Sequence, residues 1–440
     1  MTLSPNAPIA ATDVHESLGK WILVDGYPFV LDLENSKGAK LVDARTGREY
    51  LDFFGCFGST PIGWNHPALC DQEWLNKVAT AVINKPANSD LYTWQMAEFV
   101  EAIGNAAMPE GFKHMFFVDG GALAVENALK VAFDWKVRRN RSKGVDSDVG
   151  QLVIHFKKAF HGRSGYTLSV TNTLVDKVAY FPKFDTWPRV DAPAIDFDNP
   201  DAVLELEKDS LAQIDAAFDL HGDDIACILI EPLQCEGGDR HFRPEYLAAL
   251  KSRCEKHDCL LIFDEVQTGF FGSGKTWAWQ NYGVEPDIFA FGKKSQQCGI
   301  MAGPRIDDVP DNCFQTSSRI NSTWGGNLVD MMRATKVLEV IENDNLVANA
   351  SRQGERWITG MRAIAADFAT VTNVRGLGLI MAFDMPDGDS RNALLGAMME
   401  AGMIGLSSGE RTVRFRPHLA ITDADTDLCL ELTRKALQAL

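Results

Sequence analysis

Long apolar segments are absent from this sequence of 440 residues. No stretch approaches the roughly 18 uncharged apolar residues that a membrane-spanning helix needs. Residues 1–13 carry neither the basic region nor the apolar region of a signal peptide. We therefore expect a cytoplasmic protein that does not enter a membrane.

Paired cysteines and basic clusters are lacking as well. The nine cysteines are an odd number and form no C-x-x-C pair, which is typical of reduced thiols in a cytosolic protein. Cys254 and Cys259 flank His257, but a helix that leads into a strand explains this spacing, so we predict no metal site. Lys and Arg number 43 against 60 Asp and Glu, and the net charge of −17 argues against binding to nucleic acid or an anionic membrane.

The sequence does contain a regular alternation of short apolar runs and helical segments. Hydrophobic residues make up 45% of the chain and charged residues 23%, which is typical of globular proteins. The runs lack strict polar–apolar alternation, as expected for strands buried on both faces of a mostly parallel sheet. The predicted strands are 115–118, 152–156, 226–230, 259–263 and 287–291, with helices at 122–139 and 244–257.

The two ends of the chain carry a second group of predicted elements. We predict an α/β fold in which residues 76–335 form a large domain, and residues 1–75 and 336–440 together form a small α+β domain. The elements outside the central sheet are strands at 28–33, 39–43, 49–53, 376–385 and 413–422, an irregular loop at 303–320, and a helix at about 327–342 that continues to 367.

Charged residues directly follow two of the apolar runs. Asp264 and Glu265 come after one run, at the carboxyl edge where open α/β sheets bind ligands, although either could instead cap a helix or lie in a surface loop. Lys293 follows the next run, and a lysine desolvated in a cleft can form a Schiff base. The alternative is a surface lysine, and Lys294 fits that alternative well.

Other segments of the chain offer a possible anion-binding turn and a possible partner for an aromatic ring. Gly120 and Gly121 separate a strand from a helix, where backbone N–H groups can bind an anion, although a plain turn is the alternative. This turn matches neither the P-loop pattern nor G-x-G-x-x-G. Phe160 could stack on an aromatic ring, or it could simply pack in the core. Arg163 could bind a carboxylate of a ligand, or it could form a structural ion pair. Three further candidates are Glu231, Glu236 and Thr323.

Taken together, these groups match pyridoxal 5′-phosphate. The cofactor presents a phosphate, an aromatic ring, a ring cation and an aldehyde, and the candidate residues offer a partner for each. A carboxylate such as Asp264 keeps the ring nitrogen protonated, so that the ring can draw electrons from a substrate carbanion. A nicotinamide dehydrogenase is disfavoured because the sequence has no dinucleotide fingerprint.

These motifs resemble, in their order and over nearly the whole chain, those of the class III (ω-amino acid) aminotransferases of fold type I. In that family the Schiff-base lysine is the sixth residue after the aspartate of a Pro-Asp dipeptide, which selects Lys293 after Asp287 and excludes Lys294. The resemblance also implies a homodimer in which Thr323 reaches the phosphate of the neighbouring subunit. It assigns Asp264 to the ring nitrogen, Gln267 to the ring hydroxyl, Val266 and Phe160 to the two ring faces, and Gly121 and Ala122 to the phosphate.

Within the family, the sequence is most similar to the lysine 6-aminotransferase subfamily. The usual class III phosphate turn is N-S-G-T-E-A, whereas residues 119–124 read D-G-G-A-L-A, which is the variant found in that subfamily. The same subfamily is indicated by four further segments: AFHGRSGYTLSVTNT, GGDRHFRPE, FGKK and INSTWGGN. The resemblance implies a ping-pong transfer of the ε-amino group of L-lysine to 2-oxoglutarate. The products are L-glutamate and 2-aminoadipate 6-semialdehyde, which cyclises to a piperideine carboxylate.

The same resemblance implies the residues that bind the substrates. Arg163 is expected to bind the α-carboxylate of lysine, far from the reacting amine, and Arg414 the carboxylate beside the keto carbon of 2-oxoglutarate. Glu236 matches the acid that pairs with Arg414 in the first half-reaction and releases it in the second, which occludes the wrong binding mode. Gln267 and Asn321 are also expected to contact substrate.

Two departures and three rival functions stay open. Pro417-His418-Leu419 replaces the family's Pro-Pro-Leu, which leaves the choice between Arg414 and Arg416 open. Cys235 replaces a glycine in Q-G-E, which is tolerated if its φ is not positive. The rivals are an ω-aminotransferase for ornithine or 4-aminobutyrate, an aminomutase, and a cofactor-binding paralogue without turnover.

Overall fold

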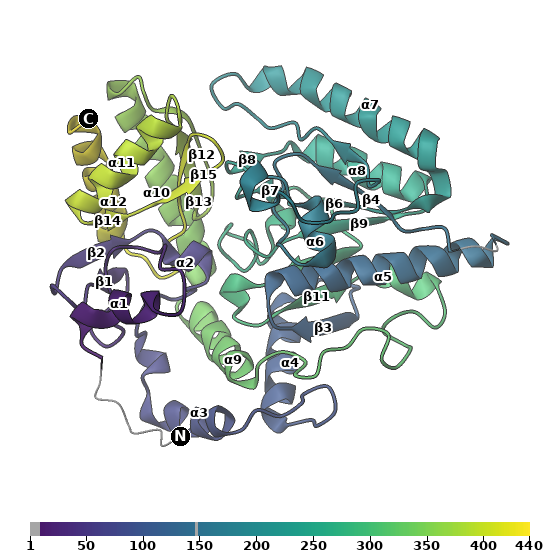
Figure 1. The fold of residues 1–440 in the computed structure, drawn as a ribbon, viewed down its shortest axis with the longest axis horizontal. Coiled ribbons are helices and arrows are strands. Elements are labelled where there is room, and N and C mark those ends of the chain that lie inside the picture. Colours follow the sequence, from purple (N-terminus) through teal and green to yellow (C-terminus); the bar gives the residue numbers. More distant parts are fainter. Residues whose placement is uncertain (1–8, 146–147) are drawn as a thin grey trace.

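The computed structural model describes residues 9–145 and 148–440, and in this part of the chain seven strands form the main sheet (Figure 1). The strand order is β3-β11-β10-β9-β6-β4-β5. β11 pairs antiparallel with β10 and β3, and the other pairs are parallel, so the expected mostly parallel α/β sheet is confirmed. The strands are β3 (His114–Val118), β4 (Leu152–Phe156), β5 (Arg189–Val190), β6 (Ile225–Ile230), β9 (Leu260–Asp264), β10 (Ile288–Phe291) and β11 (Cys298–Ala302).

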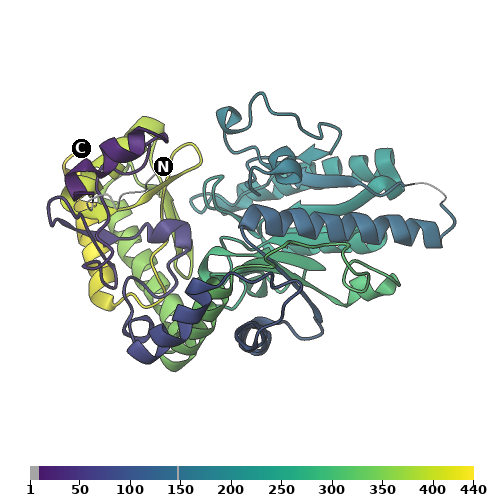
Figure 2. The same cartoon turned by 60° about the horizontal axis from the view of Figure 1, so that its bottom comes forward.

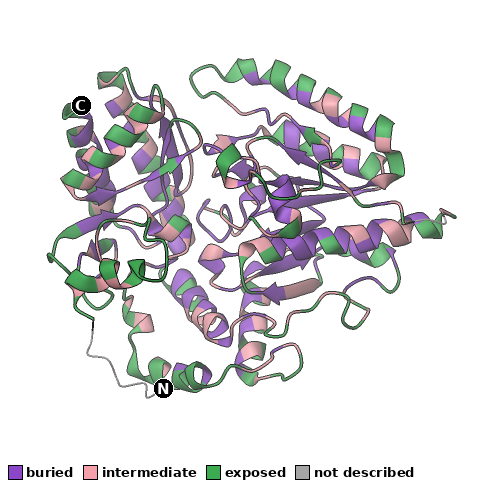
Figure 3. Cartoon of the chain, in the orientation of Figure 1, coloured by how far each residue is buried: buried purple, intermediate pink, exposed green. Residues whose placement is uncertain are grey.

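Alternate residues of the central strands are buried on opposite faces of this sheet. On β9, Leu260 and Ile262 belong to the hydrophobic cluster that includes residues of α5 (Gly121–Ser142), whose long axis lies along the sheet in Figure 2. Leu261 and Phe263 belong to the cluster that includes α8 (Pro244–Lys256). Burial on both faces explains why these strands are apolar throughout, and Figure 3 shows the exposed residues gathered on the outer sides of the helices.

Both ends of the chain contribute to a smaller unit beside this sheet (Figure 1). β2 (Glu49–Asp52) pairs with β1 (Lys40–Val42) and also, in parallel, with β14 (Met403–Ile404) from the other end of the chain. A second, antiparallel sheet contacts α10 (Leu346–Asp367). Its strand order is β12 (Thr372–Leu377), β13 (Ile380–Asp384), β16 (Thr412–Phe415) and β15 (Leu406–Ser408). This pairing supports a small α+β domain made from both ends, while the boundaries at residues 75 and 335 stay a prediction.

The other elements complete these two units. The strands are β7 (Leu233–Gln234) and β8 (Arg240–His241). The helices are α1 (Val14–Gly19), α2 (Gly55–Gly58), α3 (Gln72–Ile83), α4 (Trp94–Ala107), α6 (Gly165–Val170), α7 (Val203–His221), α9 (Leu328–Asn343), α11 (Gly388–Ala401) and α12 (Asp423–Gln438). Short 3-10 turns include η3 (Val175–Lys177), η7 (Lys293–Ser295) and η8 (Pro304–Asp308).

Three expectations from the sequence were wrong in detail, and one strand of the main sheet was missed. Residues 28–33 form no strand, and only an isolated bridge joins Leu31 to Asp43. Residues 376–385 lie in a hairpin of two strands, because Gly378 turns the chain with a φ of 56°. The strand predicted at 413–422 ends at Phe415. The prediction also lacked β11, the one antiparallel member of the described main sheet.

The described residues contain no candidate for a membrane-spanning helix. Within residues 9–145 and 148–440, no helix is both long enough and apolar enough to cross a membrane. Residues 1–8, on which the expectation of no signal peptide partly depends, lie outside the described residues, as do residues 146–147.

Candidate active site

Except for Asn321 and Thr323, the predicted site residues of the large unit lie in segments that follow the carboxyl ends of five strands. β3 is followed by the glycine turn, β4 by Phe160, β6 by Glu231 and Glu236, β9 by Val266, and β10 by Lys293. Because the five strands run in the same direction, these segments share one edge of the sheet, which is where open α/β folds bind ligands.

Lys293 stands in a strained backbone position directly after β10. Its φ is +54°, which is unfavourable for a residue with a side chain, and it begins the short turn η7. Gly292 before it has no room for a side chain, because a Cβ there would lie 2.8 Å from Cys298 Sγ. Burial, with a contribution from the nearby Arg414, lowers the pKa of the Lys293 amine. A lysine in this setting deprotonates more readily and is a better nucleophile.

Asp264 is held by a histidine that the sequence reasoning missed. The carboxylate is buried at the end of β9, where Oδ2 lies 2.8 Å from Nδ1 of His161 and Oδ1 accepts the Val266 N–H at 3.0 Å. His161 is also buried, and its Nε2 has no hydrogen-bond partner among the described residues. The position of His161 between two candidates, Phe160 and Arg163, was the available signal.

The glycine turn closes tightly on the rest of the site. Gly121 begins the 22-residue helix α5, and Gly120 before it has a φ of 105°. A Cβ on Gly121 would lie 2.6 Å from Val266 Cγ1, and a Cβ on Gly162 would lie 2.4 Å from Ala122 Cβ. These close approaches place backbone N–H groups and the positive end of a long helix beside the carboxyl edge, which suits a phosphate.

Glu231 connects two segments of the site. One carboxylate oxygen accepts the Phe160 N–H at 2.9 Å, and the other accepts the Cys235 N–H at 3.1 Å. Burial, together with the charge of Asp264, raises the pKa of Glu231 well above its usual range. Glu231 therefore fixes the backbone of the candidate stacking residue relative to the segment that carries Glu236.

Arg414 on β16 is almost completely buried and is partly paired. Its Nη2 donates to Glu236 Oε2 at 2.5 Å and its Nη1 donates to Gln267 Oε1 at 3.1 Å, while Nε has no partner among the described residues. Glu236 also accepts a hydrogen bond from Lys177 Nζ at 2.9 Å. Burial acts to raise the pKa of Glu236, but Arg414 and Lys177 outweigh burial and lower it.

Arg416 has a different set of partners from Arg414. It pairs with Asp239, which is as deeply buried, and donates to the Phe415 carbonyl at 2.9 Å and to Gln267 Oε1 at 3.2 Å. Because the partner of Arg416 is a fully buried aspartate, Arg416 is not available to a substrate carboxylate, and the geometry favours Arg414 as the residue that binds it. That choice stays a prediction.

Arg163 is exposed at the start of α6, and the structure gives it no hydrogen bond or ion pair within the described chain. Its neighbours are anchored by Glu126 on α5, which the sequence reasoning also missed. Glu126 Oε1 accepts bonds from Ser164 Oγ at 2.9 Å, Tyr166 N at 2.6 Å and Thr167 N at 3.3 Å. The guanidinium of Arg163 is thus presented to solvent from a fixed backbone.

Thr323 and Asn321 lie exposed in a surface loop, and neither side chain forms a hydrogen bond with Lys293 within the described chain. The loop is tied to a distant segment, because Ser89 Oγ donates to the Thr323 carbonyl at 3.2 Å. Lys85 lies over the ring of the exposed Trp324, 3.4 Å from its centroid. The expected roles of Thr323 and Asn321 stay predictions.

Two observations correct the reasoning from sequence. Lys294 is not a surface lysine: it is buried, and desolvation lowers its pKa to about 7. The pattern G-x-x-x-x-G-K-T does occur in the chain, at residues 269–276, but no helix begins at its lysine as a P-loop requires. Its Gly269 is instead packed against the backbone of Glu265, where a Cβ would lie 2.7 Å from the carbonyl oxygen.

Cys235 shows how a departure from the family pattern is accommodated. The residue is fully buried, and it is not among the non-glycine residues with positive φ. The condition under which cysteine can replace the glycine of Q-G-E is therefore met.

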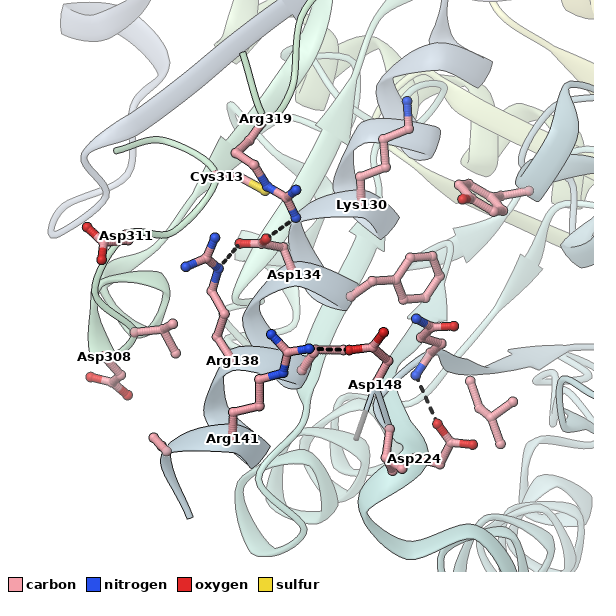
Figure 4. Close-up of a pocket in the computed structure, with 18 of the residues that line it drawn as sticks. Lys130, Asp134, Arg138, Arg141, Asp148, Asp224, Asp308, Asp311, Cys313 and Arg319 are labelled. Carbon is pink, nitrogen blue, oxygen red and sulfur yellow. Dashed lines mark hydrogen bonds and ion pairs between the residues drawn. The ribbon is translucent and has the colours of Figure 1, made fainter. Parts of the chain in front are cut away.

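A wide hollow of about 1050 Å³ lies away from this edge, along the second half of α5 (Figure 4). Asp134 in its wall is paired with Arg138 Nε at 3.0 Å and with Arg319. None of the predicted site residues lines this hollow, so it is separate from the candidate active site.

Comparison with known proteins identifies the family. Residues 23–437 match the family model described as aminotransferase class-III. The chain belongs to the class III aminotransferases. The site of this class III aminotransferase fits pyridoxal 5′-phosphate, the cofactor of the family: a helix N-terminus, a fixed carboxylate, an aromatic ring and a lysine of lowered pKa meet at one edge.

Relatives within the family match the chain over nearly its full length. The L-lysine-epsilon aminotransferase of Mycobacterium tuberculosis is 50% identical over 434 residues, which cover 98% of this chain and 96% of the relative. The L-lysine-epsilon aminotransferase of Amycolatopsis lactamdurans is 46% identical over 435 residues, covering 97% and 96%. A solved structure of lysine aminotransferase from M. tuberculosis in the internal aldimine form has a TM-score of 0.96, 50% identity, and coverage of 98% and 100%.

Proposed function

We propose that this class III aminotransferase transfers the ε-amino group of L-lysine to 2-oxoglutarate. The products are 2-aminoadipate 6-semialdehyde, which cyclises to a piperideine carboxylate, and L-glutamate. The observation that carries the proposal is the 50% identity, over 98% of the chain, to an L-lysine-epsilon aminotransferase. The glycine turn at residues 119–124, which departs from the usual class III sequence, supports the same subfamily.

The family pattern assigns the residues that would hold the cofactor, and the geometry of the edge supports this part of the proposal. The N–H groups of Gly121 and Ala122 would bind the phosphate, and Phe160 and Val266 would cover the two ring faces. Asp264 would pair with the ring nitrogen, and Gln267 would lie near the ring hydroxyl. The bound cofactor supplies an electron sink that stabilises negative charge on the reacting substrate carbon.

The chain's own groups carry out the proton transfer and fix its geometry. With the cofactor bound, Lys293 would hold it covalently through Nζ, and the same amine, once free, would accept the proton from Cε of the substrate lysine. Its lowered pKa favours the uncharged form of the amine, which is the form that accepts a proton. His161 keeps the Asp264 carboxylate in one orientation through the 2.8 Å contact.

Specificity for the two substrates comes from two arginines, one exposed to solvent and one paired with a glutamate. Arg163 is exposed and free to bind the α-carboxylate of lysine at a distance from the reacting amine. Arg414 is occupied by Glu236, so an α-carboxylate cannot bind there and bring the α-amine to the cofactor. When Glu236 moves away, Nη2 is released beside Nε, which has no partner in residues 9–145 and 148–440. This edge of the guanidinium can then bind the 2-oxoglutarate carboxylate with two hydrogen bonds.

We also propose a homodimer in which Thr323 completes the phosphate site of the neighbouring subunit. Large apolar side chains are exposed in the segments concerned: Trp324 beside Thr323, Leu123 beside the glycine turn, and Tyr92 near the anchor of the Thr323 loop. Such side chains suit a subunit interface. All nine cysteines are unpaired, which supports the cytoplasmic location that we propose.

Subunit mixing tests the shared site. In a heterodimer of Lys293→Ala and Thr323→Ala chains, one site carries both substitutions and the other carries neither. Mixed and refolded chains are therefore expected to recover activity that neither homodimer has alone. No recovery in heterodimers isolated with two different affinity tags would place Thr323 in its own subunit's site or outside any site.

A half-reaction experiment tests the proposed substrates. L-lysine added to the holoenzyme without keto acid is expected to remove the absorption band of the lysine-bound cofactor, and 2-oxoglutarate is expected to restore it. Ornithine and 4-aminobutyrate serve as comparisons, since one methylene in an apolar pocket changes binding by about 1–3 kcal/mol. A band removed by a shorter amine and not by lysine rejects lysine as donor. An unchanged band with every amine indicates a paralogue without turnover, and lysine rearrangement without keto acid indicates an aminomutase.

A further inference from the structure

Lys177 forms an ion pair with Glu236 that neither the sequence motifs nor the proposed function includes. Lys177 Nζ lies 2.9 Å from Glu236 Oε1, although the two residues are 59 positions apart in the chain. The other carboxylate oxygen, Oε2, accepts the hydrogen bond from Arg414 Nη2. A single carboxylate is therefore shared between two cations, one on each side.

The two cations are held very differently. The side chain of Arg414 is 1% exposed and its Nη1 is fixed by Gln267. The side chain of Lys177 is 28% exposed and stands at the end of the short turn η3. Within the described residues, the Lys177 ammonium has no hydrogen-bond partner except Glu236. Lys177 can therefore follow Glu236 when that side chain moves, whereas Arg414 stays in place.

We propose that Lys177 is a positioning residue that holds Glu236 away from Arg414 while Arg414 binds 2-oxoglutarate. The inference rests on the proposed function, in which Glu236 must leave Arg414 for the second half-reaction. A carboxylate that is largely buried and has lost its cation is costly, the more so beside a dianionic substrate. The ammonium of Lys177, a compact charge on a flexible stem, removes that cost by staying with Glu236.

The pairing predicts which half-reaction depends on Lys177. With Glu236 on Arg414, the carboxylate has two cations, and loss of Lys177 leaves one. With Glu236 released from Arg414, Lys177 is the one cation among the described residues that still bonds to Glu236, and loss of Lys177 leaves no bonded cation. Removing Lys177 therefore destabilises the released state more than the paired state and shifts the population toward the paired state. Binding of 2-oxoglutarate is weakened, while binding of L-lysine is not.

The test compares Lys177→Met and Lys177→Arg with a matched control, Lys183→Met. Lys183 lies in the same segment but donates to the Val178 carbonyl at 3.0 Å and does not contact Glu236. Calorimetric titration of each holoenzyme with glutarate, a dicarboxylate without a keto group, measures binding without turnover. The two half-reactions are measured separately, with L-lysine alone and with 2-oxoglutarate added to the aminated enzyme.

We expect Lys177→Met to weaken glutarate binding and to raise the KM for 2-oxoglutarate about tenfold, the factor for one lost charge-assisted hydrogen bond. The L-lysine half-reaction should stay within about twofold of wild type, because its paired state keeps Arg414. Lys177→Arg should restore glutarate binding, and Lys183→Met should behave as wild type. A neutral Lys177→Gln variant should repeat the result of Lys177→Met.

Three results would overturn the inference: equal losses in both half-reactions, unchanged glutarate binding, or a loss confined to L-lysine, which would place Lys177 on the donor carboxylate. Failure of the proposed function is a separate outcome. If wild type reacts with ornithine and not with L-lysine, the donor is rejected. The comparison at Lys177 still stands, because the enzyme can be aminated with the accepted donor.

Discussion

His161 and Asp264 form a buried pair, with 2.8 Å between Nδ1 and Oδ2, although 103 positions separate them in the chain. The same carboxylate accepts the Val266 N–H, so both of its oxygens are held from within the protein. The group assigned to the ring nitrogen is therefore oriented before any cofactor binds, which removes the cost of ordering it at that step.

Substitution of His161 should disturb the site without unfolding the protein. Loss of the charge-assisted bond leaves Asp264 held on one side only, and His161→Leu is expected to lower kcat and weaken cofactor binding about tenfold to a hundredfold. His155→Leu is the control, because His155 is equally buried in the same region but does not contact Asp264. Fluorescence titration of the apoenzyme with cofactor measures the effect. Equal losses in both variants would mean that packing, and not the pair, explains the result.

The two adjacent lysines should behave differently. Lys293→Ala is expected to abolish turnover and the absorption band of the lysine-bound cofactor, because the amine that forms the link is removed. Lys294→Met should keep the band, since the Lys294 amine contacts the Gln267 carbonyl at 3.4 Å and is not aligned by the family spacing. Spectra of the two purified variants decide the question. A band retained in Lys293→Ala and lost in Lys294→Met would reverse the assignment.

Glu236→Gln should affect the half-reactions in the opposite sense to Lys177→Met. The amide is neutral and cannot occupy Arg414 as the carboxylate does at 2.5 Å, so the arginine becomes available to the α-carboxylate of lysine. We expect the L-lysine half-reaction to slow at least tenfold, as expected for one lost charge-assisted bond. The 2-oxoglutarate half-reaction should be unchanged or faster. Single-turnover measurements of each half-reaction check this, and an unchanged reaction with L-lysine would remove Glu236 from donor specificity.

Lys294 should make the stability of the protein depend on alkaline pH. Burial lowers its pKa to about 7 in the folded state, from 10.5 for an ordinary lysine. The unfolded chain therefore binds more protons between these two values, and the contribution of Lys294 to stability rises as pH increases from about 7 to 10.5. Lys294→Met should be more stable than wild type at pH 7, with a difference that shrinks toward pH 10. Denaturant unfolding at both pH values measures it, and a difference independent of pH would contradict the buried-charge explanation.

Much of the large domain and the identity of the candidate site could be predicted from the sequence. The central strands are apolar throughout because both faces of the sheet are covered, so they appear as compact runs, and the run at residues 152–156 coincides with β4. The polar residues that follow these runs lie at one edge because parallel strands end together. The phosphate turn was predictable because its glycines have a local, backbone reason to be there: Gly120 has a φ of 105°, and Gly121 has no space for a side chain.

Contacts between distant segments were decided only by the tertiary structure. Arg414 and Arg416 have the same side chain and nearly the same position in the sequence, but one pairs with Glu236 and the other with the buried Asp239. The bond between Lys177 and Glu236 and the burial of Lys294 likewise depend on how separate segments pack against the sheet edge. Periodicity and turn chemistry act over a few residues, whereas the electrostatic setting of a charged group depends on whatever folding brings beside it. The sequence by itself therefore determined which chemical groups are present, and the packing of the two units decided which of them are paired.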